Sequence, residues 1–353
     1  MKRYAFLDWM RGLAVLIMIQ CHVFNAFTRP DLRHESLYVL TQFIGGMAAP
    51  LFLFMAGMTS GFQIESMETR MVGRAGRWRG ALRRAGYVLV LAFLFRFTNF
   101  VTGLPNARVN DLFKVDILNC MALALGVFSC VALFAFPQRL RLTLILSLAI
   151  AAVAPVMNAL DWSGFPIVAR YYLVPGPDRG QFPFFPCAAY VGFGLAAGSL
   201  VKKAPAVRMD ALGQWAALFG CTLIFGGEYF ANLPYSLYPK SDFWRDSPAL
   251  ILIRVGIALV MLAAAYLWTE FCPRSGWSWL ESLGKTSLLV YWVHVLLVYG
   301  GLAYAFKRAL TPGGSAAATL IVILLMLALS GLRLRYKARR IVEGRAAAAA
   351  AGA

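Results

Sequence analysis

The sequence has few charged residues and none of the short motifs typical of soluble enzymes. Of its 353 residues, 14% are charged and 60% hydrophobic, whereas soluble domains are roughly 25% charged. It lacks a phosphate-binding loop, a dinucleotide-binding glycine pattern, a CxxC pair, an HExxH motif and a GxSxG turn. Its six cysteines have no metal-ligand spacing, so we expect no metal site. Soluble-enzyme chemistry is therefore not indicated.

Acidic residues are scarce as well. The chain has 16 Asp and Glu against 34 Lys and Arg, which gives a formal net charge of +18. Such an excess can indicate nucleic-acid binding, but here the basic residues lie mostly in short segments beside apolar runs. Because this is the positive-inside pattern of membrane proteins, we expect membrane lipids as partners and no nucleic acid.

What the chain does have is a series of apolar runs close to membrane length. About 20 helical residues cross the hydrocarbon core, so these runs predict an all-α polytopic membrane helix bundle with about ten transmembrane helices. Most basic residues fall on one side of the spans, which predicts an N-in/C-in orientation. The segment 70–84 is expected to be a cytoplasmic loop, and 161–181 and 231–247 outer loops of turns. The expected spans are 6–27, 39–62, 85–101, 115–136, 142–160, 182–201, 212–230, 248–271, 286–306 and 315–332.

The first span is unusually polar for a membrane helix. At about 100° per residue, Asp8, Arg11 and His22 fall on one stripe of the helix. At about 1.5 Å per residue, Arg11 and His22 lie about 16 Å apart along the axis. Ionisable groups are costly in hydrocarbon, so we expect this stripe to face the bundle interior or a polar cavity.

The chain contains only three histidines. We interpret His22 as functional, because it shares its stripe with two charged residues and histidine transfers protons near neutral pH. His294 lies near the middle of the ninth span, where one hydrogen bond to a neighbouring helix is the structural alternative. His34 follows the first span, either as a solvated loop residue or as a candidate at the mouth of the cavity.

Four further charged residues are candidates. Asp116 begins the fourth span, where it could cap the helix, pair with Lys114 or Arg96, or orient a histidine. Arg83 and Arg84 precede the third span and are expected to fix topology and to contact lipid headgroups. Arg96 lies within the apolar run and requires a partner.

Several segments resemble known membrane enzymes. The segment LDWMRGLAVLIMIQCH resembles the first-span signature of transmembrane acyltransferases. That signature is an Arg-Gly pair with a histidine eleven residues after the arginine. Similarly, APLFLFMAGMTSGF resembles the second-span block of these enzymes, and LGKTSLLVYWVHVLLVYG resembles their late-span block. With LRRAGYVLVLAFLFR, KVDILN and FPFFPCAAYVGFGLAAG, the resemblance is closest to bacterial proteins with the heparan-α-glucosaminide N-acetyltransferase catalytic domain, over most of 4–299.

The resemblance implies transfer of an acyl group, foremost acetyl, from cytoplasmic acyl-CoA to an amine or hydroxyl of a sugar or glycoconjugate on the outer side. Acyl-CoA would be a co-substrate rather than a permanently bound cofactor. His22 matches the histidine of family-three acyltransferases, whereas the lysosomal enzyme carries its histidine later, nearer the place of His34. The implied catalytic candidates are His22, His34, Asp116 and His294, and the implied donor-binding candidates are Asp8, Arg11, Arg83, Arg84 and Arg96.

The same resemblance implies a protein of the bacterial inner membrane, with a homodimer as one option for assembly. We expect residues 1–335 to form a single membrane acyltransferase domain and 336–353 a basic, then alanine-rich cytoplasmic tail. A transporter or flippase for a sugar- or lipid-linked substrate is the alternative, since it would also place polar groups within the membrane. A non-catalytic membrane scaffold would not need three polar residues on one stripe.

Overall fold

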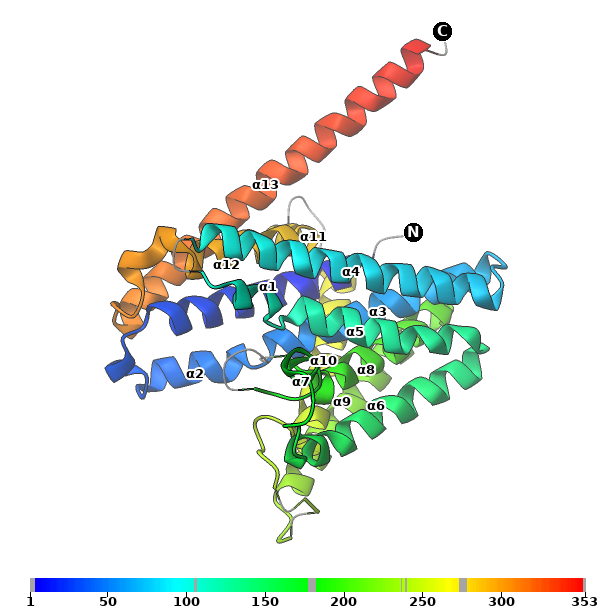
Figure 1. The fold of residues 1–353 in the computed structure, drawn as a ribbon. Coiled ribbons are helices and arrows are strands. Elements are labelled where there is room, and N and C mark those ends of the chain that lie inside the picture. The colour runs from blue at the N-terminus through cyan, green and yellow to red at the C-terminus, as the bar shows by residue number, and fades with distance from the viewer. Residues whose placement is uncertain are drawn as a thin grey trace. The chain divides into compact units, whose positions relative to one another are not determined.

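The fold is that of a computed structural model, which describes residues 4–104, 107–176, 182–235, 237–238, 240–272 and 278–351, with side chains to residue 343. Within these residues the secondary structure is helical apart from isolated bridge residues, among them the pair Thr28 and Leu310 (Figure 1). The predicted all-α class is confirmed. The first basic residues of the chain, the end of the predicted loop 161–181 and the last two residues of the predicted tail lie outside the described residues.

Seven helical segments among the described residues are long and apolar enough to cross a membrane. One of them, Ser36–Thr69, contains the helices α2 (Ser36–Gly45) and α3 (Ala48–Thr69). The other six correspond to α1 (Ala5–Phe27), α4 (Arg74–Thr102), α6 (Phe136–Ala159), α8 (Phe184–Lys203), α10 (Pro248–Phe271) and α13 (Pro312–Ala351).

Three further apolar segments match the remaining predicted spans. The helices α11 (Trp279–Lys285) and α12 (Ser287–Tyr299) meet at an angle of 86° and count as an eighth span if the pair crosses together. A shorter segment, Ile117–Leu133, joins α5 (Ile117–Phe128) to η3 (Ser129–Leu133), and α9 covers Met209–Ala231. Each of the ten predicted spans therefore has a helix at its position, while the number of crossings and the orientation stay predictions.

Several helices extend beyond the apolar runs that predicted them. The basic segment 70–84 is not a loop, because α4 begins at Arg74, and the outer segment 161–181 contains the short helix α7 (Ile167–Leu173). Likewise α13 continues through the tail to Ala351. Hydropathy marks only the part of a helix that suits hydrocarbon, whereas arginine and alanine are good helix formers that prolong it into water.

The described chain forms two compact units, Met1–Ala48 with Trp268–Ala353 (unit 1) and Ala49–Leu267 (unit 2). In unit 2, α3 and α8 pack closely through glycines. A Cβ added at Gly61 would come within 2.6 Å of the Leu195 carbonyl oxygen, and one at Gly194 would overlap the backbone of Phe54. Small residues let membrane helices approach in this way.

A buried ion cluster ties helices of unit 2 together. Arg139, in the first turn of α6, is fully buried and donates to Glu65 and Glu68 of α3 at 2.7 and 2.6 Å. Arg139 precedes the predicted span 142–160, yet its charge is satisfied inside the protein. Buried charges require such pairing.

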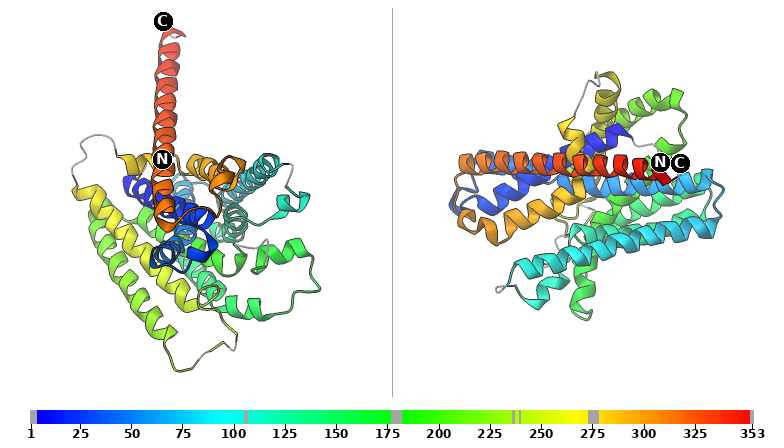
Figure 2. Two further views of the ribbon diagram at one scale, coloured as in Figure 1. Left: turned by 90° about the vertical axis from the view of Figure 1, so that its left-hand side faces the viewer. Right: turned by 90° about the horizontal axis from the view of Figure 1, so that it is seen from above.

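Unit 1 is built around α1, which packs against α2, α11, α12 and α13. A Cβ at Gly12 of α1 would overlap the backbone of Leu280, and one at Gly284 would overlap that of Asp8, so α1 and α11 are in backbone contact. In Figure 1 and in the left view of Figure 2, the C-terminal part of α13 projects beyond the other helices of this unit.

Two buried hydroxyl pairs hold α13 in unit 1. Thr28, at the end of α1, contacts Ser315 through their hydroxyl oxygens at 2.8 Å. Thr286, at the junction of α11 and α12, contacts Ser330 in the same way at 2.7 Å. The second pair fixes α13 one turn before its basic stretch begins at Arg333.

Candidate functional site

The polar stripe of α1 faces the packed interior. Asp8, Val15 and Met18, all on the stripe, are 1%, 0% and 4% exposed. The Arg11 side chain is 25% exposed and lies 3.5 Å from the Asp8 carboxylate. A buried carboxylate next to a partly exposed guanidinium is the arrangement expected where a charged pair meets the edge of a bundle.

His22, at the other end of the stripe, forms a pair with His294 of α12. His22 Nδ1 lies 3.0 Å from His294 Nε2, and His294 Nδ1 lies 2.7 Å from the carbonyl oxygen of Val290. His294 is fully buried, whereas His22 is partly exposed. The structure thus joins two of the predicted catalytic residues through a direct hydrogen bond.

The hydrogen-bond pattern determines which ring nitrogens carry protons in the neutral pair. A carbonyl oxygen only accepts, so His294 Nδ1 must carry a hydrogen and its Nε2 must hold a lone pair. That lone pair accepts from His22 Nδ1–H, which leaves the lone pair of His22 on Nε2. Among the described residues, His22 Nε2 has no hydrogen-bond partner. The arrangement therefore presents one basic nitrogen on the partly exposed ring.

Aromatic rings surround the two imidazoles. The His22 and His294 rings are nearly parallel, with centroids 5.2 Å apart and an interplanar angle of 12°. Tyr299 meets His22 edge to face at 5.5 Å, and Tyr291 meets His294 in the same way at 6.0 Å. These contacts restrict rotation of both rings, so the orientation of His22 is set by packing as well as by hydrogen bonding.

His34 lies apart from this pair in the fold. It is exposed in the turn between η1 (Pro30–Leu32) and α2. The hydrogen bond from Arg29 is the largest cause of a lowered pKa of the nearby Asp31. Among the described residues, neither a hydrogen bond nor a ring contact orients His34.

Asp116 and Arg96 form an ion pair within unit 2. Asp116 is the N-cap of α5, where its backbone N–H donates to Asn119 Oδ1 at 3.1 Å. Lys114 pairs instead with Asp111 at 2.9 Å. Of the roles considered for Asp116, the structure shows two: it caps α5 and it pairs with Arg96. The same ion pair gives Arg96 the partner that it was expected to need.

The two other arginines predicted to bind the donor lie on α4 of unit 2. Arg84 donates to the backbone carbonyl and the hydroxyl of Thr59 at 3.3 and 2.5 Å. Arg83 is exposed on the helix surface. Arg84 therefore joins α4 to α3, while a role of either residue in donor binding stays a prediction.

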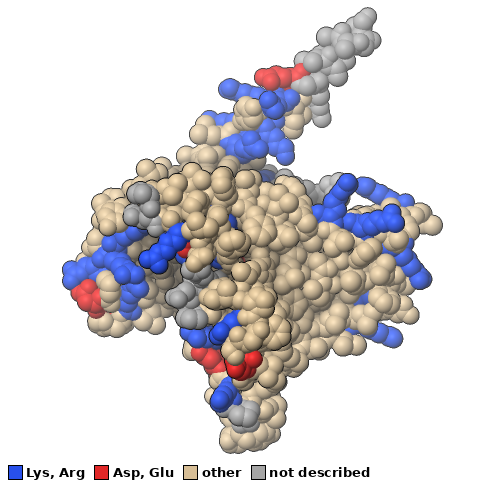
Figure 3. All heavy atoms as spheres, viewed as in Figure 1, with Lys and Arg blue, Asp and Glu red and all other residues tan. Residues whose placement is uncertain are grey.

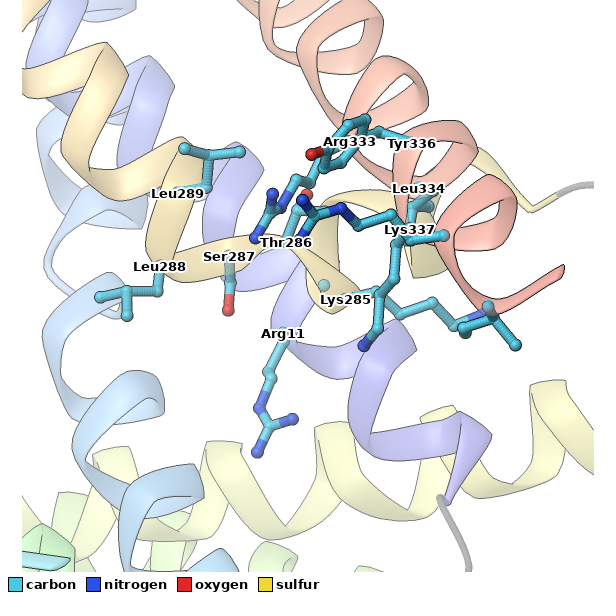
Figure 4. A pocket seen from close by; sticks show the side chains of 13 residues that line it. Arg11, Lys285, Thr286, Ser287, Leu288, Leu289, Arg333, Leu334, Tyr336 and Lys337 are labelled. Carbon is cyan, nitrogen blue, oxygen red and sulfur yellow. The ribbon is translucent and has the colours of Figure 1, made fainter. Parts of the chain in front are cut away.

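A cavity of about 580 Å³ in unit 1 brings Arg11 together with basic residues that sequence patterns did not select. Figure 4 shows Arg333 and Lys337 reaching from α13 toward the junction of α11 and α12, with Lys285 beside them and Arg11 on α1. The remaining lining residues are Gly284, Thr286, Ser287, Leu288, Leu289, Leu334, Tyr336, Arg340 and Ile341. Only the pattern of basic residues four apart along α13 could have indicated this site.

In the described part of the chain, no group of three or more His, Cys, Asp or Glu side chains is placed to hold a metal ion. All six cysteines are free thiols.

Together, these features describe an integral membrane protein with a hydrogen-bonded histidine pair among its helices. Residues 4–332 match the model of acyltransferase family 3, described as an acyltransferase domain. The chain belongs to this family and is a membrane acyltransferase. No curated protein matches the sequence.

Proposed function

We propose that this acyltransferase moves an acyl group, foremost acetyl, from cytoplasmic acyl-CoA to an amine or hydroxyl of a sugar or glycoconjugate on the outer side of a bacterial inner membrane. The observation that carries the proposal is the ordered histidine pair, which leaves a basic nitrogen on His22. Support for the donor and acceptor classes comes from the likeness of the first-span and late-span motifs to those of glucosaminide N-acetyltransferases.

In this mechanism His22 is the general base. Its Nε2 takes the proton from the acceptor O–H or N–H as the oxygen or nitrogen attacks the thioester carbonyl carbon. The tetrahedral intermediate then expels sulfur, the C–S bond breaks, and the departing CoA sulfur receives the proton from His22. The acyl group ends on the acceptor as an ester or an amide.

His294 would act as a positioning residue in that cycle. While His22 carries two protons, His294 Nε2 accepts the hydrogen bond from Nδ1 and stabilises the imidazolium. His294 is itself fixed by its bond to the Val290 carbonyl oxygen at 2.7 Å. Each proton transfer therefore takes place at the same nitrogen of a ring held in one orientation.

Purified protein incubated with radiolabelled acetyl-CoA and a panel of sugars and amino sugars tests the proposal. We expect labelled product and release of CoA, and a loss of at least about 10²-fold in His22→Ala, the lower end of general-base effects. His34→Ala is the matched control, because it removes the other candidate base, and it should keep its activity. Label retained on the protein without acceptor would instead indicate an acyl-histidine intermediate.

The outcomes separate the function from its alternatives. A transporter or flippase would neither release CoA nor produce a labelled acceptor. Full activity of His22→Ala would show that His22 is not the general base. Loss of activity in His34→Ala alone would identify His34 as the base instead. Unfolding temperatures in detergent establish that each variant is folded.

A further inference from the structure

The cavity in unit 1 is lined by five basic side chains from three parts of the chain. Arg11 comes from α1, Lys285 from α11, and the rest from α13. In the expected N-in/C-in orientation, Arg11 lies near the cytoplasmic end of the first span and the other four lie in cytoplasmic segments. Figure 3 shows basic side chains gathered along the projecting part of α13. Arg333, Lys337 and Arg340 recur there every three or four residues, so they lie on one face of the helix.

Charge inside the cavity is only partly balanced. Arg11 lies 3.5 Å from Asp8, and Lys285 donates to Glu281 at 2.8 Å. Arg333, Lys337 and Arg340 have no carboxylate partner among the described residues, although Arg340 lies over the ring of Tyr336 at 5.3 Å. Three like charges close together repel one another, and a bound polyanion would offset that repulsion.

We propose that this cavity binds the phosphate groups of the acyl-CoA donor, with Arg333, Lys337 and Arg340 as the phosphate-binding residues. The inference rests on the proposed function and names its donor site. A volume of about 580 Å³ lies within the usual range for ligand pockets, about 300–1,000 Å³. Guanidinium groups bind phosphate through paired hydrogen bonds, and lysine binds it as a point charge.

The start of α12 adds a second favourable contribution. The cavity is lined there by Ser287, Leu288 and Leu289, the first three residues of the helix. The first backbone N–H groups of a helix have no partner within the helix and carry partial positive charge. The position of α13 above this helix start is held by the Thr286–Ser330 hydroxyl pair.

Two helices lead from the cavity to the histidine pair. On α1, eleven residues separate Arg11 from His22, or about 16 Å along the axis; on α12, seven residues separate Ser287 from His294, or about 10 Å. These helices pack against each other in unit 1. A donor whose phosphates occupy the cavity can therefore extend its flexible arm along α1 and α12 toward His22.

A lipid headgroup offers the same phosphate chemistry, since basic residues beside a bilayer attract anionic lipids. Two features favour the nucleotide. The cavity is bounded by Tyr336, which is 51% exposed and offers an aromatic surface on which a purine can stack. The cavity also lies at the end of the two helices that carry the histidines.

Binding of unacylated CoA to the full chain in nanodiscs of phosphatidylcholine tests the site without turnover. We expect Arg333→Gln with Lys337→Gln to weaken CoA binding at least about tenfold, because two charge-assisted contacts are lost. The matched control is Arg335→Gln with Arg339→Gln. It removes two charges at the same spacing from exposed positions outside the cavity lining and should leave the dissociation constant within about twofold, as solvated charges contribute little.

Equal affinities in the two double variants would overturn the inference. The inference would also be overturned if the cavity variant lost co-purifying phosphatidylglycerol but bound CoA as before. The phosphate bound in the cavity would then belong to a lipid headgroup. In turnover assays the cavity variant should raise the KM for acetyl-CoA and retain kcat, whereas His22→Ala should lose kcat and retain CoA binding. If His22→Ala is inactive but the cavity variant binds CoA normally, the proposed acyl transfer stands. The cavity is then not the site that binds the donor phosphates.

Discussion

Replacing His294 by phenylalanine tests the histidine pair most directly. Phenylalanine fills the fully buried site, yet it removes the acceptor 3.0 Å from His22 Nδ1. His22 then loses the bond that holds its proton on Nδ1, so its lone pair is no longer confined to Nε2. We expect a lower kcat with little change in the KM for the donor, since the cavity of unit 1 is untouched.

The size of the effect follows from the hydrogen bond that is lost. A neutral hydrogen bond contributes about 0.5–1.5 kcal/mol, and a buried donor left without a partner costs about 1–3 kcal/mol. At about 1.4 kcal/mol per tenfold change, these values give a loss of roughly twofold to hundredfold in kcat. His22→Ala should lose about 10²- to 10⁴-fold, because the base itself is gone.

Acetyl transfer by His294→Phe, His294→Gln, His22→Ala and the double variant His22→Ala/His294→Phe provides the assay. Glutamine retains an acceptor oxygen and should recover part of the rate. Because His294 acts only through His22, the double variant should be no slower than His22→Ala alone. An unchanged rate in His294→Phe, or losses that multiply in the double variant, would refute the positioning role.

Three further predictions concern stability and are checked by thermal unfolding in detergent. Gly284→Ala should destabilise the protein by about 1–3 kcal/mol, the usual cost of overpacking, because the added methyl meets the backbone of α1, and an unchanged unfolding temperature would contradict that contact. Arg139→Met should cost about 3–5 kcal/mol, because it leaves Glu65 buried without its guanidinium. Arg139→Met combined with Glu65→Gln should recover much of that loss. Arg96→Leu should destabilise more than the double variant Arg96→Leu/Asp116→Asn, in which no buried charge remains.

The outline of the fold was predictable from local sequence. Long apolar runs can only be helices in a bilayer, so each predicted span, from 6–27 to 315–332, contains a helix. Helix ends were harder to predict, as at α4, whose basic first turns continue the helix into water. The 86° break at Thr286 was also not predictable, since LGKTSLLVYW contains no proline that would mark it.

The candidate site was predictable only in part. Asp8, Arg11 and His22 share one helix, so their common stripe follows from helical periodicity alone. His294 lies 272 residues from His22, and no local pattern shows that the two rings are hydrogen-bonded.

The sequence by itself determined that this is an all-helical membrane protein with a charged pair and an imidazole on one stripe of its first helix, because the helical repeat and the polarity of each residue are local properties. Only the tertiary structure decided that His294 orients His22 and that basic residues of α13 line one cavity with Arg11 and Lys285. Hydrogen bonds and charge clusters between distant segments depend on how helices pack, and packing is a property of the folded chain as a whole.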